Sequence, residues 1–186
     1  MGQFKFIETD IEGLIIIEPK VFSDHRGYFM ETYNERDFKE NGLGMTFVQD
    51  NQSKSRRGVL RGLHYQTQHQ QGKLVRALSG EVYDVAVDLR RGSKTYKKWL
   101  GVILSGENRK QLYVPEGFAH GFVVLSEEAE FTYKCTDFYH PEFEGGILWN
   151  DPEIGIIWPL EAIGELSLSD KDRKLKTLAE QDYVTL

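Results

Sequence analysis

Short runs of β-branched and aromatic residues recur along the whole chain, and each run ends at a turn signal. In the stretch 81–88 (EVYDVAVD), the apolar and acidic positions interleave in the fashion of a β-strand. Glycine, serine, asparagine and proline separate the runs. The pattern predicts strands at 3–8, 13–18, 28–33, 46–51, 59–66, 73–78, 81–89, 97–104, 111–114, 121–125, 129–138 and 146–149.

Helical signals are scarce by comparison. Asn34 is a suitable N-cap for a short helix at 35–40, which would end at Asn41 and Gly42. A second helix is predicted from Ser169 through about residue 178, because Ser169 and Asp172 have the spacing of a capping box. With no linker or repeat to divide it, the chain is predicted to form one all-β domain over residues 1–186, a sandwich or barrel with a few short peripheral helices.

The composition narrows the classes of partner. Among 186 residues, 23 Lys and Arg stand against 29 Asp and Glu, a formal net charge of −6, which argues against a nucleic-acid partner. A few well-placed cations can still hold a small anion. A single cysteine, Cys135, excludes an internal disulfide framework and favours the cytoplasm. No secretory signal and no apolar run long enough to span a bilayer is present, so no membrane partner is expected.

Two segments, 58–66 (GVLRGLHYQ) and 114–122 (VPEGFAHGF), carry the candidate chemistry. Each places a histidine on a strand or at its entrance, beside glycines that let backbones approach closely. The spacing Gly-x5-His in the first and Pro-x-Gly-x-x-His in the second resembles the two half-motifs of the cupin jelly roll. This resemblance predicts a cupin-like jelly-roll fold in which His64 and His120 share one interior.

A metal-binding cupin needs further ligands, and they are missing here. Where a metal cupin has a second histidine and then a glutamate, this chain has Gln66 and, nearby, Gln70 and Gln71. Amides are poor substitutes for imidazole and carboxylate around a divalent transition metal. His69 is close in sequence but lies in a polar tract predicted to be a loop. The pattern therefore predicts no catalytic metal.

Without a metal, His64 is a candidate general base, because an imidazole exchanges protons near neutral pH. The nearby cations Arg61 and Lys73 favour a site for an anion and for a developing oxyanion. Plainer structural interpretations stand beside these. His64 could be bound by a backbone group, Lys73 could be a solvated strand end, and Arg61 could form a surface ion pair.

Six segments in order along residues 13–175 resemble the dTDP-4-dehydrorhamnose 3,5-epimerase family. One such segment alone is modest evidence, whereas all of them in the same order are specific. They are 48–51 (VQDN), 58–66 (GVLRGLHYQ), 71–76 (QGKLVR), 113–122 (YVPEGFAHGF), 133–139 (YKCTDFY) and 168–172 (LSDKD).

The resemblance implies roles for particular residues. The family's catalytic base matches His64, held by a carboxylate that matches Asp172, while the proton donor matches Tyr133 and the oxyanion-supporting lysine matches Lys73. The resemblance also implies no cofactor and a homodimer in which Arg26 and Glu31 reach the ligand of a neighbouring subunit. The apolar strand at 14–17 is expected to be available for pairing with another chain. Contacts to the nucleotide sugar match Arg26, Glu31, Gln49, Asn51, Arg61, His120, Glu144 and Lys171.

These roles agree with the chemistry that the family implies. In dTDP-4-dehydro-6-deoxy-D-glucose, carbons 3 and 5 both flank the ketone, so removal of either proton gives an enolate with its charge on oxygen 4. A cation beside that oxygen stabilises the charge. Inversion needs a base on one face and an acid on the other, and a phenol is a protonated donor at neutral pH. The implied product is dTDP-4-dehydro-L-rhamnose in dTDP-L-rhamnose biosynthesis, formed without net electron transfer.

Several alternatives remain open. A 5-epimerase, or another epimerase of dTDP-4-keto-6-deoxy sugars, could carry the same site, and a non-catalytic sugar-nucleotide binding module or a metal-dependent cupin oxygenase could share the barrel. Tyr139 competes with Tyr133 as donor, since a spacing of six puts both on one face of a strand. Asp172 could simply cap the last helix, Tyr133 could be core packing, and His120 could be structural.

Overall fold

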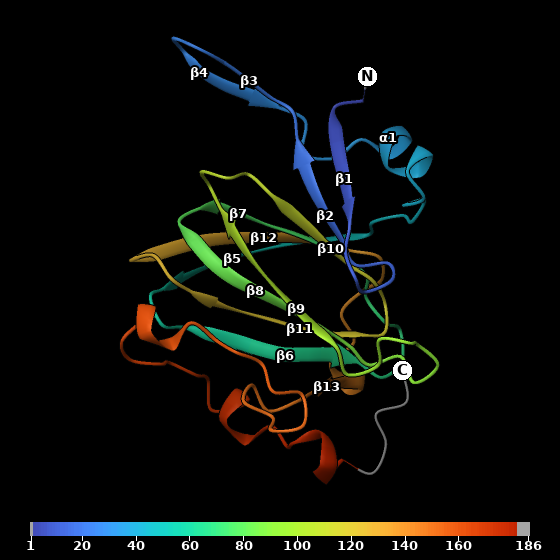
Figure 1. Cartoon of the computed structure of the whole chain (residues 1–186), viewed down its shortest axis with the longest axis vertical. Helices are drawn as coiled ribbons and strands as arrows, with labels where there is room; N and C mark the ends of the chain where they lie inside the picture. The colour runs from blue at the N-terminus through green and yellow to red at the C-terminus, as the bar shows by residue number, and fades with distance from the viewer. Residues whose placement is uncertain (1, 182–186) are drawn as a thin grey trace.

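Two antiparallel β-sheets packed face to face form the centre of the structure, a computed structural model that describes residues 2–181 (Figure 1). Residue 1 and residues 182–186 of the expected single domain lie outside the described part. Helical segments are few and short, so the predicted all-β class with peripheral helices is confirmed. None of the helices between residues 2 and 181 is long and apolar enough to cross a membrane.

The strand order within each sheet differs from the order along the chain. The larger sheet contains, in spatial order, β1 (Phe4–Glu8), β2 (Ile15–Pro19), β10 (Gln111–Val114), β7 (Lys73–Ser79), β12 (Glu128–Cys135) and β5 (Gln49–Arg56). The smaller sheet contains β13 (Glu144–Gly146), β6 (Leu60–Gln66), β11 (Phe118–Val124), β8 (Glu81–Asp88) and β9 (Trp99–Ser105). A separate hairpin consists of β3 (Val21–Asp24) and β4 (Gly27–Met30). The helical segments are α1 (Glu35–Glu40), η1 (Pro141–Phe143), η2 (Leu160–Ala162), η3 (Asp172–Lys174) and η4 (Leu178–Glu180).

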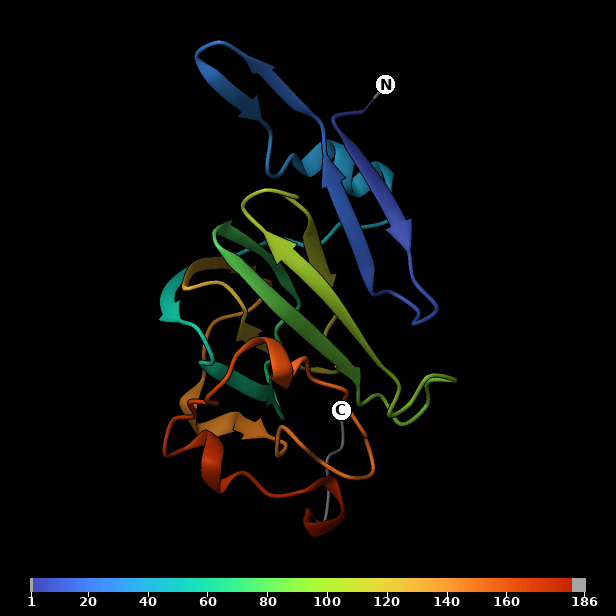
Figure 2. The ribbon, with the colours of Figure 1, turned by 60° about the vertical axis from the view of Figure 1, so that its left-hand side comes forward.

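The smaller sheet is buried on both faces, and its strands supply apolar side chains to both because successive side chains point to opposite faces. On β8, Val82 and Ala86 point into the core between the sheets, where they join Phe131 of the opposite sheet. Val85 and Val87 point the other way into a second core, formed with the segment 147–178. That C-terminal segment covers the outer face of the smaller sheet, as Figure 2 shows in orange and red. Removing these apolar side chains from water on both faces holds the three layers together.

The predicted helix at 35–40 is confirmed as α1. The Asn34 side chain accepts a hydrogen bond from the backbone N–H of Asp37 at 3.3 Å, as an N-cap should. Phe38 is the buried residue of this helix, and its ring meets those of Phe4 and Phe6 edge to face at centroid distances of 5.2 Å. This aromatic cluster fixes α1 against the first strand.

Some predicted strands are displaced in the structure. The strand expected at 28–33 is instead the second arm of the hairpin β3–β4, and the strand expected at 46–51 begins later and continues to Arg56. Within the described residues β5 is an edge strand paired with β12, and its polar sequence (QDNQSKSR) carries no apolar signal. β12 ends at Cys135 rather than at 138, so the expected placement of Tyr139 on that strand is wrong.

The apolar strand expected to pair with another chain is internal to the sheet. β2 lies between β1 and β10, and Leu14 and Ile17 are fully buried. The open edge at this side of the sheet is therefore β1.

The helix predicted from Ser169 to about residue 178 is wrong. A single 3-10 turn, η3, is followed at Leu175 by extended backbone, with φ −62° and ψ 142°. The extended chain lets the carbonyl of Lys176 accept a hydrogen bond from the N–H of Leu148 at 2.9 Å. It also brings the Leu175 side chain against Gly146. A Cβ on Gly146 would lie only 2.7 Å from Cδ2 of Leu175. Tertiary contacts thus override the local capping signal.

Candidate active site

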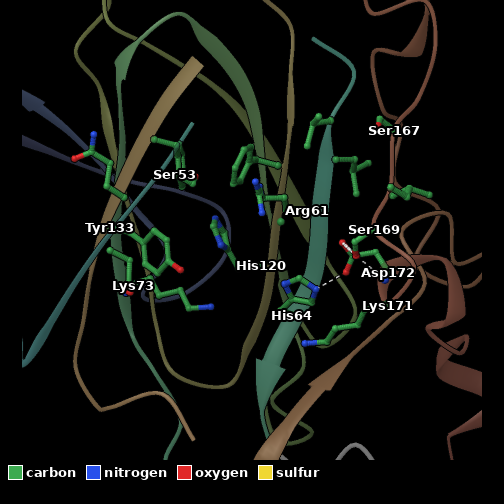
Figure 3. Close-up of a pocket in the computed structure, with 18 residues that line it drawn as sticks. Ser53, Arg61, His64, Lys73, His120, Tyr133, Ser167, Ser169, Lys171 and Asp172 are labelled. Atoms are coloured by element: carbon green, nitrogen blue, oxygen red, sulfur yellow. Dashed lines mark hydrogen bonds and ion pairs between the residues drawn. The ribbon is translucent and has the colours of Figure 1, made fainter. Parts of the chain in front are cut away.

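A pocket of about 580 Å³ lies between the two sheets (Figure 3). Strands of both sheets line it, together with the segment 167–172 that follows the sandwich. Of the residues predicted from the sequence, the following line this pocket: Asn51, Arg61, His64, Lys73, His120, Tyr133, Lys171 and Asp172. Residues from six separate parts of the chain are therefore brought to one cavity.

A close approach of β6 and β11 brings the two motif histidines together. A Cβ on Gly62, whose φ is +130°, would lie 2.6 Å from the Cα of Gly121, so only glycine fits here. His64 and His120 are directly opposite partners in this strand pair. The expectation that they share one interior is borne out by this register and by their common pocket.

His64 is held by a carboxylate that lies 108 residues away in sequence. Its Nε2 is 2.6 Å from Oδ1 of Asp172, while the Ser169 hydroxyl donates to Oδ2 at 2.9 Å. The Asp172 side chain is 4% exposed, against 29% for His64. Burial raises the pKa of Asp172, but the hydrogen bonds from His64 and Ser169 and the charge of His64 outweigh it, so this pKa is lowered. A carboxylate that stays ionised accepts a hydrogen bond from the imidazole and fixes its orientation.

The same segment shows what the capping-box spacing does. The Ser169 hydroxyl accepts a hydrogen bond from the backbone N–H of Asp172 at 3.0 Å. The Asp172 carboxylate is turned to His64 and to the Ser169 hydroxyl instead of capping a helix. Ser169 is therefore a positioning residue that the sequence suggested only as a helix cap.

His120 has its own carboxylate, which sequence reasoning missed. Nε2 of His120 lies 2.9 Å from both carboxylate oxygens of Asp84, and the Asp84 side chain is completely buried. Asp84 lies between the inward-pointing Val82 and Ala86 on β8. The signal that could have found it is an acidic residue between two inward-pointing apolar residues of a strand.

Lys73 and Tyr133 come from the larger sheet and face the histidines across the pocket, as Figure 3 shows. Desolvation lowers the pKa of Lys73, against the opposing influence of Cys135, Asp84 and Glu144. Desolvation also raises the pKa of Tyr133, so its phenol stays protonated at neutral pH. The site thus opposes a potential base on one wall with a cation and a proton donor on the other.

Two predicted binding residues lie just outside the lining. Gln49 donates from Nε2 to Oδ1 of Asn51 at 3.1 Å, and Glu144 forms an ion pair with Lys171. Glu144 also accepts a hydrogen bond from the Tyr139 hydroxyl at 2.6 Å, which raises the pKa of Tyr139 to about 12. Tyr139 itself is 48% exposed and lies outside the lining. The pocket therefore contains Tyr133 rather than its competitor.

Arg61 lines the pocket from β6 and is anchored beside it. Its guanidinium donates from Nε and Nη2 to the Ser55 hydroxyl at 3.2 and 3.0 Å. These bonds use a neutral acceptor, and no carboxylate within residues 2–181 forms an ion pair with Arg61. That charge remains available to an anion in the pocket.

Arg26 and Glu31 are not part of this pocket. Arg26 lies in the turn of the β3–β4 hairpin, 79% exposed and paired with Asp24 at 2.6 Å. Glu31 follows β4 and accepts a hydrogen bond from Asn34 at 3.0 Å. The hairpin extends away from the sandwich in both ribbon views (Figures 1 and 2). That these residues serve a neighbouring subunit stays a prediction.

The amide of Gln66, where a metal cupin has its second histidine, is engaged elsewhere. Its Nε2 donates to the carbonyls of His69 and Phe138, and its Oε1 accepts from the N–H of His140 at 2.7 Å. Gln66 does not line the pocket. The Gln66 side chain thus links the loop that contains His69 to the segment 138–140, and it provides no metal ligand to the cavity.

A jelly-roll sandwich whose pocket opposes carboxylate-bound histidines to a partly buried lysine and a phenol defines a cupin-like acid–base enzyme. Residues 8–180 match the sequence model of the family described as dTDP-4-dehydrorhamnose 3,5-epimerase. The chain belongs to this family.

Individual relatives agree with the family match. The dTDP-4-dehydrorhamnose 3,5-epimerase of Methanothermobacter thermautotrophicus is 60% identical over 180 residues, which cover 97% of both chains. The crystal structure of the dTDP-6-deoxy-D-glucose-3,5-epimerase of Legionella pneumophila, in complex with dTDP-4-keto-L-rhamnose, has a TM-score of 0.93 at 53% identity and covers 96% of this chain and 95% of its own. A 3′-monoepimerase from Streptomyces bikiniensis, in complex with dTDP-quinovose, has a TM-score of 0.85 at 35% identity, covering 92% of this chain and 86% of its own.

Proposed function

We propose that the chain inverts carbons 3 and 5 of dTDP-4-dehydro-6-deoxy-D-glucose to give dTDP-4-dehydro-L-rhamnose, a step of dTDP-L-rhamnose biosynthesis. The observation that carries the proposal is the His64–Asp172 pair at 2.6 Å, facing Lys73 and Tyr133 across one pocket. The complex of the Legionella pneumophila relative with dTDP-4-keto-L-rhamnose supports this substrate class.

In the proposed mechanism, His64 removes the proton from a carbon beside the ketone. The electrons of the broken C–H bond form an enolate, whose negative charge develops on oxygen 4 and is stabilised by Lys73. Tyr133 then delivers its proton to the opposite face of the same carbon, which forms the new C–H bond and inverts the centre. His64 releases its proton to water and Tyr133 regains one, so atoms and electrons balance without a cofactor.

The charged and amide residues of the pocket are proposed to bind the nucleotide sugar. Arg61 and Lys171 supply positive charge toward the pyrophosphate. His120, fixed by Asp84, supplies a ring nitrogen to the sugar. Asn51 contributes amide hydrogen bonds from the larger sheet, with Gln49 and Glu144 supporting at the rim of the pocket.

Solvent-exchange labelling tests this function. The chain is incubated in deuterated water with dTDP-4-keto-6-deoxyglucose and a strong chelator, and the sugar is analysed by NMR. We expect deuterium at carbons 3 and 5 and the doubly inverted product, because each inversion replaces a carbon-bound proton by one from solvent. The chelator should not prevent this, because the mechanism needs neither metal nor nicotinamide. Activity that collapses with the chelator and returns with zinc, iron or manganese would contradict metal-independent catalysis.

The same experiment separates the alternatives. Label and inversion at one carbon alone would indicate a mono-epimerase, the class named for the Streptomyces bikiniensis neighbour. That neighbour is 35% identical to this chain, against 53% for the Legionella pneumophila epimerase. A sugar-nucleotide binding module would give no label at all.

We further propose that the enzyme is a homodimer in which the β3–β4 hairpin contacts the partner. The hairpin exposes apolar rings, with Tyr28 at 53% and Phe29 at 67%, beside Arg26. Exposed apolar side chains on a projecting element are typical of an interface. A cytoplasmic location is proposed with it, since the one cysteine cannot form a disulfide within the chain.

Sedimentation tests the dimer. We expect twice the 21.5 kDa of one chain, and dissociation when Phe29→Glu places a charge in the interface. Ile157→Glu is the matched control, because Ile157 is 76% exposed and lies outside the hairpin. A fully active monomer of 21.5 kDa would contradict the proposal.

A further inference from the structure

A second cluster of ligating side chains lies outside the pocket. His69, Asp137 and His140 each offer a donor atom, and these atoms all lie within 4.8 Å of one another. The two imidazole rings are stacked, with centroids 4.3 Å apart and planes 22° apart. Nδ1 of His69 is 3.3 Å from Oδ2 of Asp137. None of the three lines the pocket, so the proposed epimerase mechanism does not use them.

The backbone of this cluster is fixed from inside the protein. Gln66, only 6% exposed, binds the carbonyl of His69 and the N–H of His140 through one side-chain amide. Gln71 donates from Nε2 to the carbonyl of Asp137 at 2.8 Å. Hydrogen bonds from two glutamines therefore hold all three ligand-bearing positions before any ion binds. Such preorganisation lowers the cost of bringing ligands together.

The donor set has the chemistry of a zinc site. Zn²⁺ binds imidazole nitrogen and carboxylate oxygen in tetrahedral sites, at about 2.0–2.2 Å from each donor. Donors on such an ion are roughly 3.3 Å apart, close to the distance between His69 and Asp137. Oε1 of Glu142 lies 3.3 Å from Nδ1 of His140, so Glu142 is within reach as a fourth ligand that could replace a water molecule. Because the side chains are partly exposed, small rotations can bring the remaining donors to the ion.

We propose that His69, Asp137 and His140 bind a divalent transition metal of the Zn²⁺ type. The ion would connect the loop between β6 and β7, which carries His69, to the segment between β12 and η1, which carries Asp137 and His140. That segment carries Tyr139, whose hydroxyl binds Glu144 at the rim of the pocket. The ion has a structural role at the rim and takes no part in proton transfer, so it is compatible with metal-independent catalysis.

Calorimetric titration of the tag-free, chelator-treated chain with zinc chloride tests the site. We expect the native chain to bind one Zn²⁺ at this cluster, and the double variant His69→Gln/His140→Gln to lose roughly tenfold or more in affinity. Zinc should also raise the Tm of the native chain but not that of the double variant. His25→Gln is the control, since His25 is exposed and lies outside the cluster.

A further variant distinguishes this cluster from the pocket histidines. His64→Asn should bind zinc as the native chain does, because His64 does not belong to the cluster. No zinc binding by the native chain, or unchanged binding by the double variant, would overturn the proposal. Binding lost in His64→Asn alone would place the ion in the pocket and also overturn it. Calorimetry and Tm are measured without the sugar substrate, so this test is independent of the proposed epimerase function.

Discussion

His64 and His120 occupy directly opposite positions on two antiparallel strands, and each imidazole is bound to a buried carboxylate of its own. The two pairs are not equivalent. Asp84 belongs to the same sheet as His120, and that pair is almost fully enclosed, with His120 8% exposed. His64 is 29% exposed and receives Asp172 from outside the sandwich. The more accessible imidazole is the one suited to exchange protons with substrate and water.

Replacing His64 by Asn should abolish proton abstraction. Asparagine keeps a hydrogen-bonding side chain but accepts no proton from carbon, so we expect a rate loss on the order of 10²–10⁴. Deuterium exchange at carbons 3 and 5 should fall together with epimerisation. The affinity for dTDP, measured by calorimetry, should change little and serves as the control. Exchange at the native rate in this variant would refute the assignment of the base.

Tyr133→Phe should separate exchange from inversion. His64 can return the proton that it removed to the same face, which restores the original configuration, whereas inversion needs the phenol on the other wall. We expect deuterium to enter the sugar while inversion, especially at carbon 5, falls sharply. Phenylalanine keeps the ring and its packing, so the fold should survive.

The control for this donor is Tyr139→Phe. Tyr139 lies outside the pocket and its hydroxyl is bound to Glu144, so this variant should keep most of the inversion rate. A Tyr133→Phe enzyme that forms the fully inverted product at the native rate would transfer the role to Tyr139 or to water.

Lys73→Met should lower the activity and raise the stability at once. Losing the cation beside oxygen 4 is expected to cost about 10²–10³ in kcat. Because desolvation lowers the pKa of Lys73, the charged ammonium is disfavoured in the folded state, and its removal should increase the free energy of unfolding at neutral pH. Steady-state kinetics and urea unfolding measure the two effects. Lys134→Met, which removes a lysine paired with Asp50, is the control, and native kcat in Lys73→Met would contradict the role.

Asp88 should make the free energy of unfolding depend on pH in the acid range. Burial raises its pKa, but hydrogen bonds from Arg90, Ser93 and Thr95 outweigh it and lower the pKa from 3.8 to about 2. A carboxyl group whose pKa is lower in the folded state stabilises that state at pH values above its pKa in the unfolded chain. This contribution disappears as the pH falls through the pKa of the folded state. The stability advantage of the native chain over Asp88→Asn should therefore shrink by about 2 kcal/mol between neutral pH and about pH 2.

Denaturant unfolding of both chains across this pH range measures that difference. Asp50→Asn is a suitable control, because the Asp50 side chain is 66% exposed and such surface changes shift stability by about 0.5 kcal/mol or less. A difference between the native chain and Asp88→Asn that stays constant with pH would contradict the prediction.

Local pattern alone determined those elements whose signal lies within a few residues. The strand at 81–88 follows from its run of β-branched and aromatic residues between turn signals, and α1 follows from the cap at Asn34. Likewise, the glycines beside His64 and His120 indicated a close approach of backbones, which β6 and β11 make. The roles of His64, Asp172, Lys73 and Tyr133 came from the resemblance of whole segments to a family, since each residue alone had a plain structural interpretation.

Only the tertiary structure decided where distant segments meet. β5 continues through the polar residues 51–56 because β12 supplies its hydrogen bonds, and no apolar period marks that pairing. The expected last helix gives way because Lys176 and Leu175 gain partners on the strand-end segment 146–148. Asp172 then reaches His64 across 108 residues of sequence. Such contacts depend on which sheet faces pack together, and a local sequence pattern does not contain that information because it reports only the nearest neighbours along the chain.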